Sequence, residues 1–465
     1  MKFHLLRLLV LYFFNYSFAK FNDDVSLSDL VPDPLFPDQA LRQDYVTLNF
    51  NYDDVDETVE SDRMFSISKM NRLYKNFLFQ GDLVISKEFL KEIVKASSIR
   101  GKRQAYRDSN YPKTIWTDEI PYSMHPKMPQ KTRRVIRTAI KFWETETCVR
   151  FKNAQQRGKN TSHLFFTHQN PGCWSTVGRD VHMKKQVVNV GPGCDQFGVV
   201  THETAHALGI FHEQSRYDRD EFVDIVENRI IDNQKLNFIK IPPQFLSTYD
   251  LPYDLGSVMH YAPYEFAKTR KHFTLLPKDL RFMATLGQID GPSFKDVLLV
   301  NKHYKCSDKC KSEISCQNLG YQNPNDCQKC KCPKSFGGRF CEEIEKSSSE
   351  ICGGTINVTD DLQALMVNFG SMKRVTSRRK CVYHLKANED RKILLAVKIL
   401  FGNCIQGCQF NHLLINDRSD LITSGFRLCC SKVEELHFFT YQNFASSEFS
   451  TGVHAFQGIL VFRSG

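Results

Sequence analysis

The placement of the cysteines divides this chain before any motif is considered. The chain has 465 residues and 16 cysteines, of which the first is Cys148. An even number of cysteines at this density is typical of an oxidising compartment, where they pair as disulfides. The length predicts two to four domains. The sequence therefore favours an extracellular protein with a cysteine-free N-terminal part and a disulfide-bonded remainder.

Residues 1–19 have the three parts of a secretory signal peptide. Lys2 and Arg7 supply positive charge, an apolar run continues to Phe14, and Ser17-Phe18-Ala19 offers small residues for cleavage. This run is too short to cross a bilayer, and no other run reaches about 20 residues. The alternative is an N-terminal strand in the core. We expect a secreted protein with no membrane span.

Residues 20–103 are expected to form a propeptide. They contain no cysteine, their first half is acidic, and they end in Arg100-Gly101-Lys102-Arg103. A furin-like processing protease cuts such a sequence, here after Arg103, whereas the alternative is a basic linker. Cleavage at this point would expose Gln104, which can cyclise and lose its charge.

Residues 104–307 have the size of one enzyme domain. A helix is predicted where apolar residues follow the helical period after Pro129, at Val135, Ile136, Ala139, Ile140 and Trp143. The runs VRF (149–151) and HLFF (163–166) are typical of short strands. A strand and hairpin closed by Cys173 and Cys194 are expected to follow.

Residues 308–342 are too few to surround a conventional core. Six cysteines lie between Cys310 and Cys341, so disulfides must hold this stretch together. Their spacing, and the glycine pair before the last cysteine, resemble an EGF-like module. A zinc knuckle is the alternative, but the stretch contains no histidine.

Residues 352–463 follow a short polar linker, EIEKSSSE, and alternate strand-like runs with turns, which predicts a β-sandwich. The opening CGGTI and the later FRLCC resemble a CUB domain. Two further cysteines are expected to pair with the last two, in a connectivity that the sequence leaves open: Cys404 and Cys408 with Cys429 and Cys430.

The segment HETAHALGIFHE predicts a catalytic zinc site. His202 and His206 differ by only about 40° around a helix, so both imidazoles leave one face. Glu203 projects towards a water on the metal without being placed as a ligand. His212 would face about 120° away on a continuous helix, so the helix must break, and Gly209 can end it in the left-handed conformation. Three protein ligands leave the fourth position of zinc open for water.

With these residues in place, the chain resembles the astacin family of metzincin zinc metalloproteases. HETAHALGIFHEQSRYDRD carries the extended zinc motif, SVMHY matches the Met-turn, and IPY and FWETETCVRF are similar as well. The resemblance implies an α+β, two-lobed peptidase that binds one catalytic Zn²⁺ through His202, His206 and His212. It also implies that Met259 forms the floor beneath the zinc and that Tyr261 can ligate the metal or move away.

The resemblance implies a mechanism as well. Zinc lowers the pKa of its water towards about 7 and polarises the scissile carbonyl. Glu203 acts as the general base, and Tyr261 donates a hydrogen bond to the developing oxyanion. The expected reaction is hydrolysis of internal peptide bonds in extracellular protein substrates.

A zymogen switch is expected within the propeptide. Phe79-Gln80-Gly81-Asp82 resembles the F-x-G-D segment of astacin propeptides, whose Asp takes the place of the water on zinc. Asp82 would then keep the precursor inactive, whereas an ordinary turn is the alternative. A blocking cysteine is excluded because the propeptide contains none.

Two positions depart from the family pattern. In family members the freed N-terminal ammonium meets the Glu after the third His, here Glu213, but Gln104 can lose its charge. Either trimming occurs or that contact is different. Several relatives carry Arg after a Gly-Gln pair, where it favours acidic substrate side chains. This chain has Gly287-Gln288-Ile289, so an acidic preference is not expected.

The resemblances also imply disulfide pairs, and the sequence itself contains two N-glycosylation sequons. The expected pairs are Cys148–Cys306, Cys173–Cys194, Cys310–Cys327, Cys316–Cys330, Cys332–Cys341 and Cys352–Cys381. The N-glycosylation sequons begin at Asn160 and Asn357.

The leading prediction is a secreted zinc endopeptidase, made as a zymogen, whose EGF-like and CUB modules bind protein or matrix partners. One alternative is a catalytically inactive extracellular binding protein that uses those modules. Another is a structural protein with a metal-stabilised domain, which would not need Glu203. The net charge of +10 is spread along the chain and does not favour nucleic-acid binding.

Overall fold

The computed structural model describes nine stretches of the chain. They are residues 66–96, 105–106, 112–116, 119–154, 162–269, 272–369, 378–430, 436–452 and 455–465. The predicted signal peptide, the cleavage sequence at Arg103 and the sequon at Asn160 lie outside them. Within these stretches, no helix has both the length and the apolar character needed to cross a bilayer.

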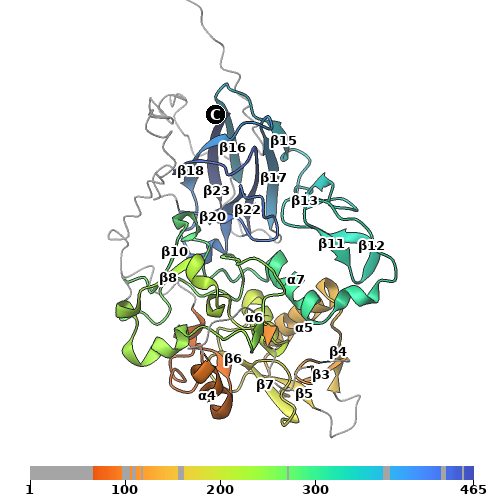
Figure 1. The fold of residues 1–465 in the computed structure, drawn as a ribbon, viewed down its shortest axis with the longest axis vertical. Helices are drawn as coiled ribbons and strands as arrows, with labels where there is room; N and C mark the ends of the chain where they lie inside the picture. The colour runs from red at the N-terminus through yellow and green to blue at the C-terminus, as the bar shows by residue number, and fades with distance from the viewer. Residues whose placement is uncertain are drawn as a thin grey trace, which may run out of the picture.

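Four parts of the described chain are distinguished in Figure 1. We name them the N-terminal segment (66–96), the central unit (105–306), the small disulfide unit (310–345) and the β-sandwich (352–465). The central unit lies between the N-terminal segment and the β-sandwich, and the small disulfide unit lies at its side.

A mixed sheet and two helices form the first lobe of the central unit. The strand order is β1-β6-β7-β5-β3-β4, in which β1 comes from the N-terminal segment. The strands of the central unit are β3 (Ile120–Met124), β4 (Phe151–Asn153), β5 (His163–Thr167), β6 (Cys173–Thr176) and β7 (Lys185–Val190). The helices are α5 (Gln130–Glu146) and α6 (Phe197–Ala207), which share one core with the sheet.

The secondary structure expected for this lobe is largely confirmed. Helix α5 begins directly after Pro129 and buries four of the five predicted apolar residues, while Val135 is half-buried against the same core. The antiparallel pair β6 and β7 is the predicted hairpin. The strand expected at 149–151 starts two residues later, at Phe151, because Cys148 is tied to Cys306 and Val149 turns into the core.

The second lobe of the central unit is mostly irregular. Its short strands are β2 (Ala105–Tyr106), β8 (Val223–Ile225), β9 (Leu246–Ser247) and β10 (Leu275–Pro277). Its 3₁₀ turns are η4 (Glu213–Ser215), η5 (Arg219–Glu221), η6 (Glu227–Arg229), η7 (Asp232–Phe238) and η8 (Leu280–Phe282), and η9 (Cys306–Lys309) ends the unit. Helix α7 (Phe294–His303) returns to the core of the first lobe, so the unit is α+β and two-lobed as expected.

The N-terminal segment is built into the central unit rather than lying beside it. It contains α3 (Ile67–Met70), β1 (Leu83–Val84) and α4 (Lys87–Ala96). Strand β1 extends the sheet in parallel with β6, with Leu83 opposite Ser175. Leu83 is fully buried in a small core that also holds Phe79 and Phe211. The added strand and this core fix the loop between Phe79 and Leu83 over the middle of the central unit.

The small disulfide unit has little regular structure. Its strands are β11 (Tyr321–Asn323), β12 (Asp326–Lys331), β13 (Phe336–Gly337) and β14 (Glu343–Ile344). It rests on the C-terminal end of α5, where the Asn325 side chain donates to the carbonyls of Glu144, Thr145 and Thr147.

The predicted β-sandwich is confirmed. One sheet has the order β15-β17-β22-β19-β20, the other β16-β23-β18-β21. The strands are β15 (Gly354–Asn357), β16 (Gln363–Phe369), β17 (Arg379–Lys386), β18 (Ile393–Phe401), β19 (Asn411–Asn416), β20 (Phe426–Leu428), β21 (Leu436–Phe439), β22 (Phe444–Thr451) and β23 (Phe456–Ser464), with a 3₁₀ turn η10 (Gln406–Cys408).

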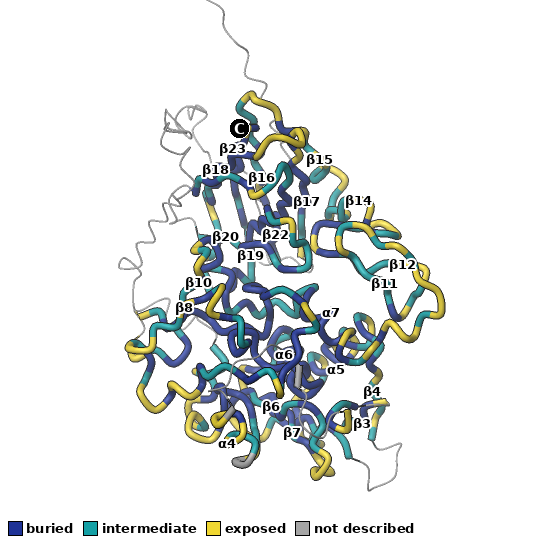
Figure 2. The backbone as a smooth tube through the Cα atoms, viewed as in Figure 1, coloured by how far each residue is buried: buried dark blue, intermediate teal, exposed yellow. Residues whose placement is uncertain are grey.

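The β-sandwich docks on the second lobe of the central unit, which the sequence does not predict. Figure 2 shows buried backbone where the two meet, and one apolar core runs through both. Arg281 donates to Asp417 at 2.9 Å, and Asp290 accepts from Arg427 at 2.7 Å. The side chain of Gln406 donates to two carbonyls of the central unit and accepts from the hydroxyl of Tyr264.

Candidate metal centre

Helix α6 carries the first half of the HExxHxxGxxH motif into the interior. Ten of its eleven residues are buried, and His202, Glu203 and His206 are at most 3% exposed. The helix has no exposed face, so its histidines are not the surface residues of an amphipathic helix. Since His202 and His206 stand one turn apart, their imidazoles leave the same side, with ring centroids 4.5 Å apart.

The helix ends where the ligand geometry requires it. Helix α6 stops at Ala207, and Gly209 has a φ of +100°, which confirms the predicted left-handed glycine. A Cβ at Gly209 would lie 2.9 Å from Nε2 of His303, so the position also has no space for a side chain. The chain then reverses and brings the ring of His212 to 4.7 Å from that of His206.

The three imidazoles are held in the tautomer that binds metals. Nδ1 of His202 lies 2.8 Å from the carbonyl oxygen of Val258, and Nδ1 of His206 lies 2.7 Å from that of Ile210. Nδ1 of His212 lies 2.9 Å from the side-chain oxygen of Gln80. Oxygen atoms of this kind only accept, so each Nδ1 carries the proton and each Nε2 keeps a lone pair.

This donor set fits a zinc ion. Nε2 of His202 and Nε2 of His206 lie 3.0 Å apart, with two lone pairs that cannot hydrogen-bond to each other. A cation between them resolves that repulsion. The Nε2 atoms and the carboxylate of Asp82 form a buried group within 4.8 Å of one another, and imidazole with one carboxylate is a usual set for zinc.

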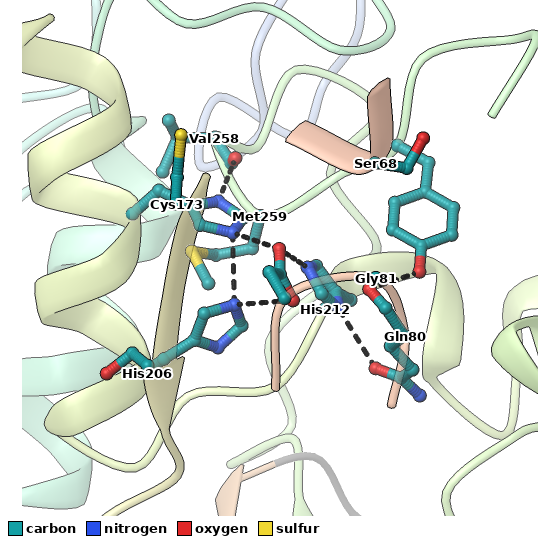
Figure 3. A network of polar contacts seen from close by, with 12 residues as sticks. Ser68, Gln80, Gly81, Cys173, His206, His212, Val258 and Met259 are labelled. Atoms are coloured by element: carbon teal, nitrogen blue, oxygen red, sulfur yellow. Dashed lines mark hydrogen bonds and ion pairs between the residues drawn. The ribbon is translucent and has the colours of Figure 1, made fainter. Parts of the chain in front are cut away.

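Asp82 brings the N-terminal segment to this group. Figure 3 shows the neighbouring Gln80 and Gly81 beside His212. One carboxylate oxygen, Oδ2, lies 3.2 Å from Nε2 of His202 and 3.1 Å from Nε2 of His212. The other, Oδ1, lies 3.7 Å from Nε2 of His206. The adjacent carbonyl of Gln80 accepts a 2.7 Å hydrogen bond from the hydroxyl of Tyr261. Asp82 therefore faces the point at which the three imidazoles converge.

The buried acids of the site have opposite pKa shifts. Burial raises the pKa of Asp82, but the contacts with His212, His202 and His206 outweigh it and hold the pKa well below its usual range. Burial raises the pKa of Glu203 well above its usual range, and the charge of Asp82 adds to this. Neither carboxyl oxygen of Glu203 has a hydrogen-bond partner among the described residues.

The SVMHY turn packs against the helix that carries His202 and His206. Met259 is 1% exposed and packs in the core that holds α6. Figure 3 shows Met259 beside His206. The carboxylate of Asp296 accepts from the hydroxyl of Ser257 at 2.6 Å and from the amide of Val258 at 2.9 Å. The carbonyl of Val258 then fixes His202, so α7 orients a metal ligand through this turn.

Glu213 has a partner that the sequence did not identify. Its carboxylate accepts from Nζ of Lys295 at 2.5 Å, from Arg216 at 3.2 Å and from the amide of Asp254 at 2.9 Å. Burial raises the pKa of Glu213, but Lys295 and Arg216 outweigh it and lower the pKa. The contact at Glu213 is thus made by an internal lysine in this structure. A lone Lys in the first turn of α7 carries no local signal for this.

The structure also places the remaining predicted residues. Asn357 is exposed on β15, where a glycan has space. All sixteen cysteines are paired, and six of the eight disulfides join the pairs expected from the resemblances: Cys148–Cys306, Cys173–Cys194, Cys310–Cys327, Cys316–Cys330, Cys332–Cys341 and Cys352–Cys381. The open connectivity in the β-sandwich is nested, with Cys404–Cys430 outside Cys408–Cys429.

These features define the class of protein: a zinc-dependent metalloprotease. The family model for the astacin peptidases matches residues 108–305. Zinc metalloproteinase nas-29 of Caenorhabditis elegans is 40% identical over 416 residues, which is 85% of this chain and 76% of that protein. Zinc metalloproteinase nas-23 of the same species is 41% identical over 372 residues, covering 80% of this chain and 68% of that protein.

A solved structure with likeness to the chain is high choriolytic enzyme 1, a hatching enzyme zinc-protease of the medaka fish Oryzias latipes. It is 26% identical, with a TM-score of 0.39, over 43% of this chain and 98% of that structure. The identity and coverage of the nematode relatives are sufficient to assign the family. This chain belongs to the astacin family, and it is a zinc metalloendopeptidase.

Proposed function

We propose that the chain is a secreted astacin-type endopeptidase made as a latent precursor, in which Glu203 is the general base and Asp82 blocks the metal. One observation carries this proposal: a carboxylate from the N-terminal segment faces all three imidazoles while Glu203 lies buried beside them. The chain supplies both the catalytic set and an internal ligand that competes with water for it.

The chemistry of the proposed reaction is divided among few groups. Zinc bound by His202, His206 and His212 would activate a water molecule and polarise the scissile carbonyl. Glu203 takes a proton from the attacking water and delivers it to the leaving amine. The hydroxyl of Tyr261 donates a hydrogen bond to the oxyanion. Burial raises the pKa of Tyr261 well above 10, so the phenol keeps the proton that it donates.

The contacts of Tyr261 support the proposed latency. Its hydroxyl donates to the carbonyl oxygen of Gln80, two residues before Asp82. That carbonyl takes the hydrogen bond that the oxyanion would need. The loop of the N-terminal segment therefore competes for two catalytic interactions at once, the metal and the phenol. Removal of the segment, by cleavage after Arg103, would free both.

The remaining parts are assigned as follows in this proposal. Residues 1–19 are a signal peptide, 20–103 a propeptide, 104–307 the peptidase, 308–342 an EGF-like module and 352–463 a CUB domain. The pairing of every cysteine supports an oxidising, extracellular location. The two C-terminal modules would bind protein or matrix partners, and the substrates would be extracellular proteins.

The variant Glu203→Gln tests the proposed chemistry. The amide keeps the size of the side chain but cannot accept the proton of water. We expect full zinc content and a loss of peptide hydrolysis of about 10²–10⁴-fold in the processed enzyme. The matched control is Glu227→Gln, because Glu227 is exposed in the second lobe. Wild-type hydrolysis by Glu203→Gln would exclude Glu203 as the general base.

A further inference from the structure

A buried acid lies in the cleft without a place in the chemistry described above. Glu265 follows the SVMHY turn and is 5% exposed. It lines the same cavity as His202, His212 and Tyr261. A carboxylate therefore lies in the wall of the cavity next to the metal centre.

The partners of this carboxylate come from the N-terminal segment. Oε2 of Glu265 accepts from the hydroxyl of Ser66 at 2.7 Å and from the hydroxyl of Ser68. Among the described residues that line the cavity, none is Lys or Arg. The charged side chain with a resolved influence on Glu265 is Asp82, which is also acidic. The carboxylate therefore has neutral hydroxyl donors and no neighbouring cation in this cavity.

The N-terminal segment fills the space in front of Glu265. The cavity that these residues line has a volume of about 30 Å³. Ala262, Gly287 and Ile289 also line this cavity. Departure of the segment would remove both hydroxyl donors and open a pocket lined by an acid and by apolar groups.

We propose that Glu265 determines specificity in the processed enzyme by binding a Lys or Arg side chain of the substrate next to the scissile bond. The aliphatic stem of such a side chain would pack on Ile289, and its charged end would pair with the carboxylate. This inference rests on the proposed release of the N-terminal segment. Glu265 touches neither the metal ligands nor the scissile bond in this assignment, so it is not a catalytic residue.

The test uses quenched-fluorescent peptides and the processed full-length enzyme. Matched peptides carry Lys, norleucine or Glu, in turn, at each of the three positions on either side of the cleaved bond. At one position we expect kcat/KM for Lys to exceed that for norleucine at least about tenfold, mainly through KM. Glu265→Gln should reduce this ratio to about one, and Glu265→Lys should favour the Glu peptide instead.

The norleucine peptides separate the two proposals. Their hydrolysis reports the endopeptidase and the release of the segment, whereas the ratio of Lys to norleucine reports Glu265. The control Glu227→Gln should keep the wild-type ratio, because Glu227 is exposed. A wild-type enzyme that cleaves norleucine peptides but has no preference for Lys at any position would overturn the inference. An unchanged preference in Glu265→Gln would do the same.

Discussion

Oδ2 of Asp82 lies 3.1 Å from Nε2 of His212, although 130 residues separate the two in sequence. This contact joins the N-terminal segment to the metal centre. Because β1 extends the central sheet next to β6, the loop that carries Asp82 is fixed at its C-terminal end. The carboxylate is thus presented by a folded element rather than by a flexible tail.

Removal of this carboxylate should make the unprocessed precursor active. In Asp82→Ala the segment keeps its strand and its small core but no longer offers a ligand to the metal. We expect the uncleaved precursor to hydrolyse a peptide at least about tenfold faster than the wild-type precursor, since the lost contact exceeds about 1.4 kcal/mol. Glu92→Ala is the control, because Glu92 is an exposed carboxylate on α4. Equal latency of Asp82→Ala and wild type would exclude the zymogen role.

Gly81 should be nearly as important for latency as its neighbour. Its φ is +81°, and a Cβ there would lie 2.9 Å from Cζ of Phe266. Gly81→Ala therefore combines a left-handed conformation, which costs about 1–2 kcal/mol for an L-residue, with a steric conflict. We expect residual activity of the precursor to rise about 5–30-fold. Lys91→Ala, on the exposed side of α4, should leave latency unchanged, and an equally latent Gly81→Ala would show that the loop adapts.

The metal centre could be predicted from sequence because its signals are local. The helical spacing of His202 and His206, and a glycine before His212, encode a face and a break within a few residues. The resemblance then supplied Tyr261, Met259 and Asp82. These residues are tied to short motifs, so no knowledge of the tertiary structure was needed to find them.

Other contacts could not be predicted because they depend on tertiary pairing. Lysine is almost never fully buried, so nothing local distinguishes Lys295 from a surface residue. Glu265 has the same ambiguity, since its hydroxyl donors come from the distant N-terminal segment. The docking of the β-sandwich joins Arg281 to Asp417 across 136 residues, and neither residue belongs to a motif. Such pairings follow from how the units pack, which periodicity does not report.

The buried pair of Lys295 and Glu213 should be essential for stability. Both side chains are at most 1% exposed, and Lys295→Met would leave Arg216 as the remaining cation bonded to Glu213. Breaking a buried pair typically costs about 3–5 kcal/mol, so the denaturant midpoint of the precursor should fall clearly. Lys302→Met changes an exposed lysine of the same helix and should have little effect. Equal midpoints for the two variants would contradict this assignment.

The contact between Arg281 and Asp417 should couple the β-sandwich to the central unit. Arg281 is 4% exposed and stacks over the ring of Phe426, so Arg281→Ala leaves the carboxylate of Asp417 buried without its cation. We expect a loss of about 3–5 kcal/mol in chemical unfolding. The control is Arg391→Ala, which breaks an exposed pair with Asp360 and should cost about 0–1 kcal/mol. If Arg281→Ala also lowered the free energy of unfolding by only about 0–1 kcal/mol, this contact would contribute little to the interface.

Latency should weaken as the pH rises, because of Glu265. Its pKa is raised from 4.5 to about 7, mainly by burial and further by the charge of Asp82, while the hydrogen bonds from Ser68 and Ser66 lower it. Once the N-terminal segment departs, the carboxyl becomes exposed and its pKa returns towards 4.5. Binding of the segment is therefore strongest below pH 4.5, where the Glu265 carboxyl is protonated both with the segment bound and after its release. That advantage is lost as the pH rises through about 7.

Residual activity of the precursor, relative to the processed enzyme at the same pH, measures this effect. We expect the ratio to increase between pH 5 and pH 8 in the wild type and to remain nearly constant in Glu265→Gln. Two ionisable neighbours of Glu265 do not titrate in that range, because the pKa of Asp82 is held low and that of Tyr261 is raised above 10. Glu265→Gln isolates the effect of Glu265, because it leaves the metal ligands and Glu203 unchanged. A pH dependence that persists unchanged in Glu265→Gln would assign it to another group.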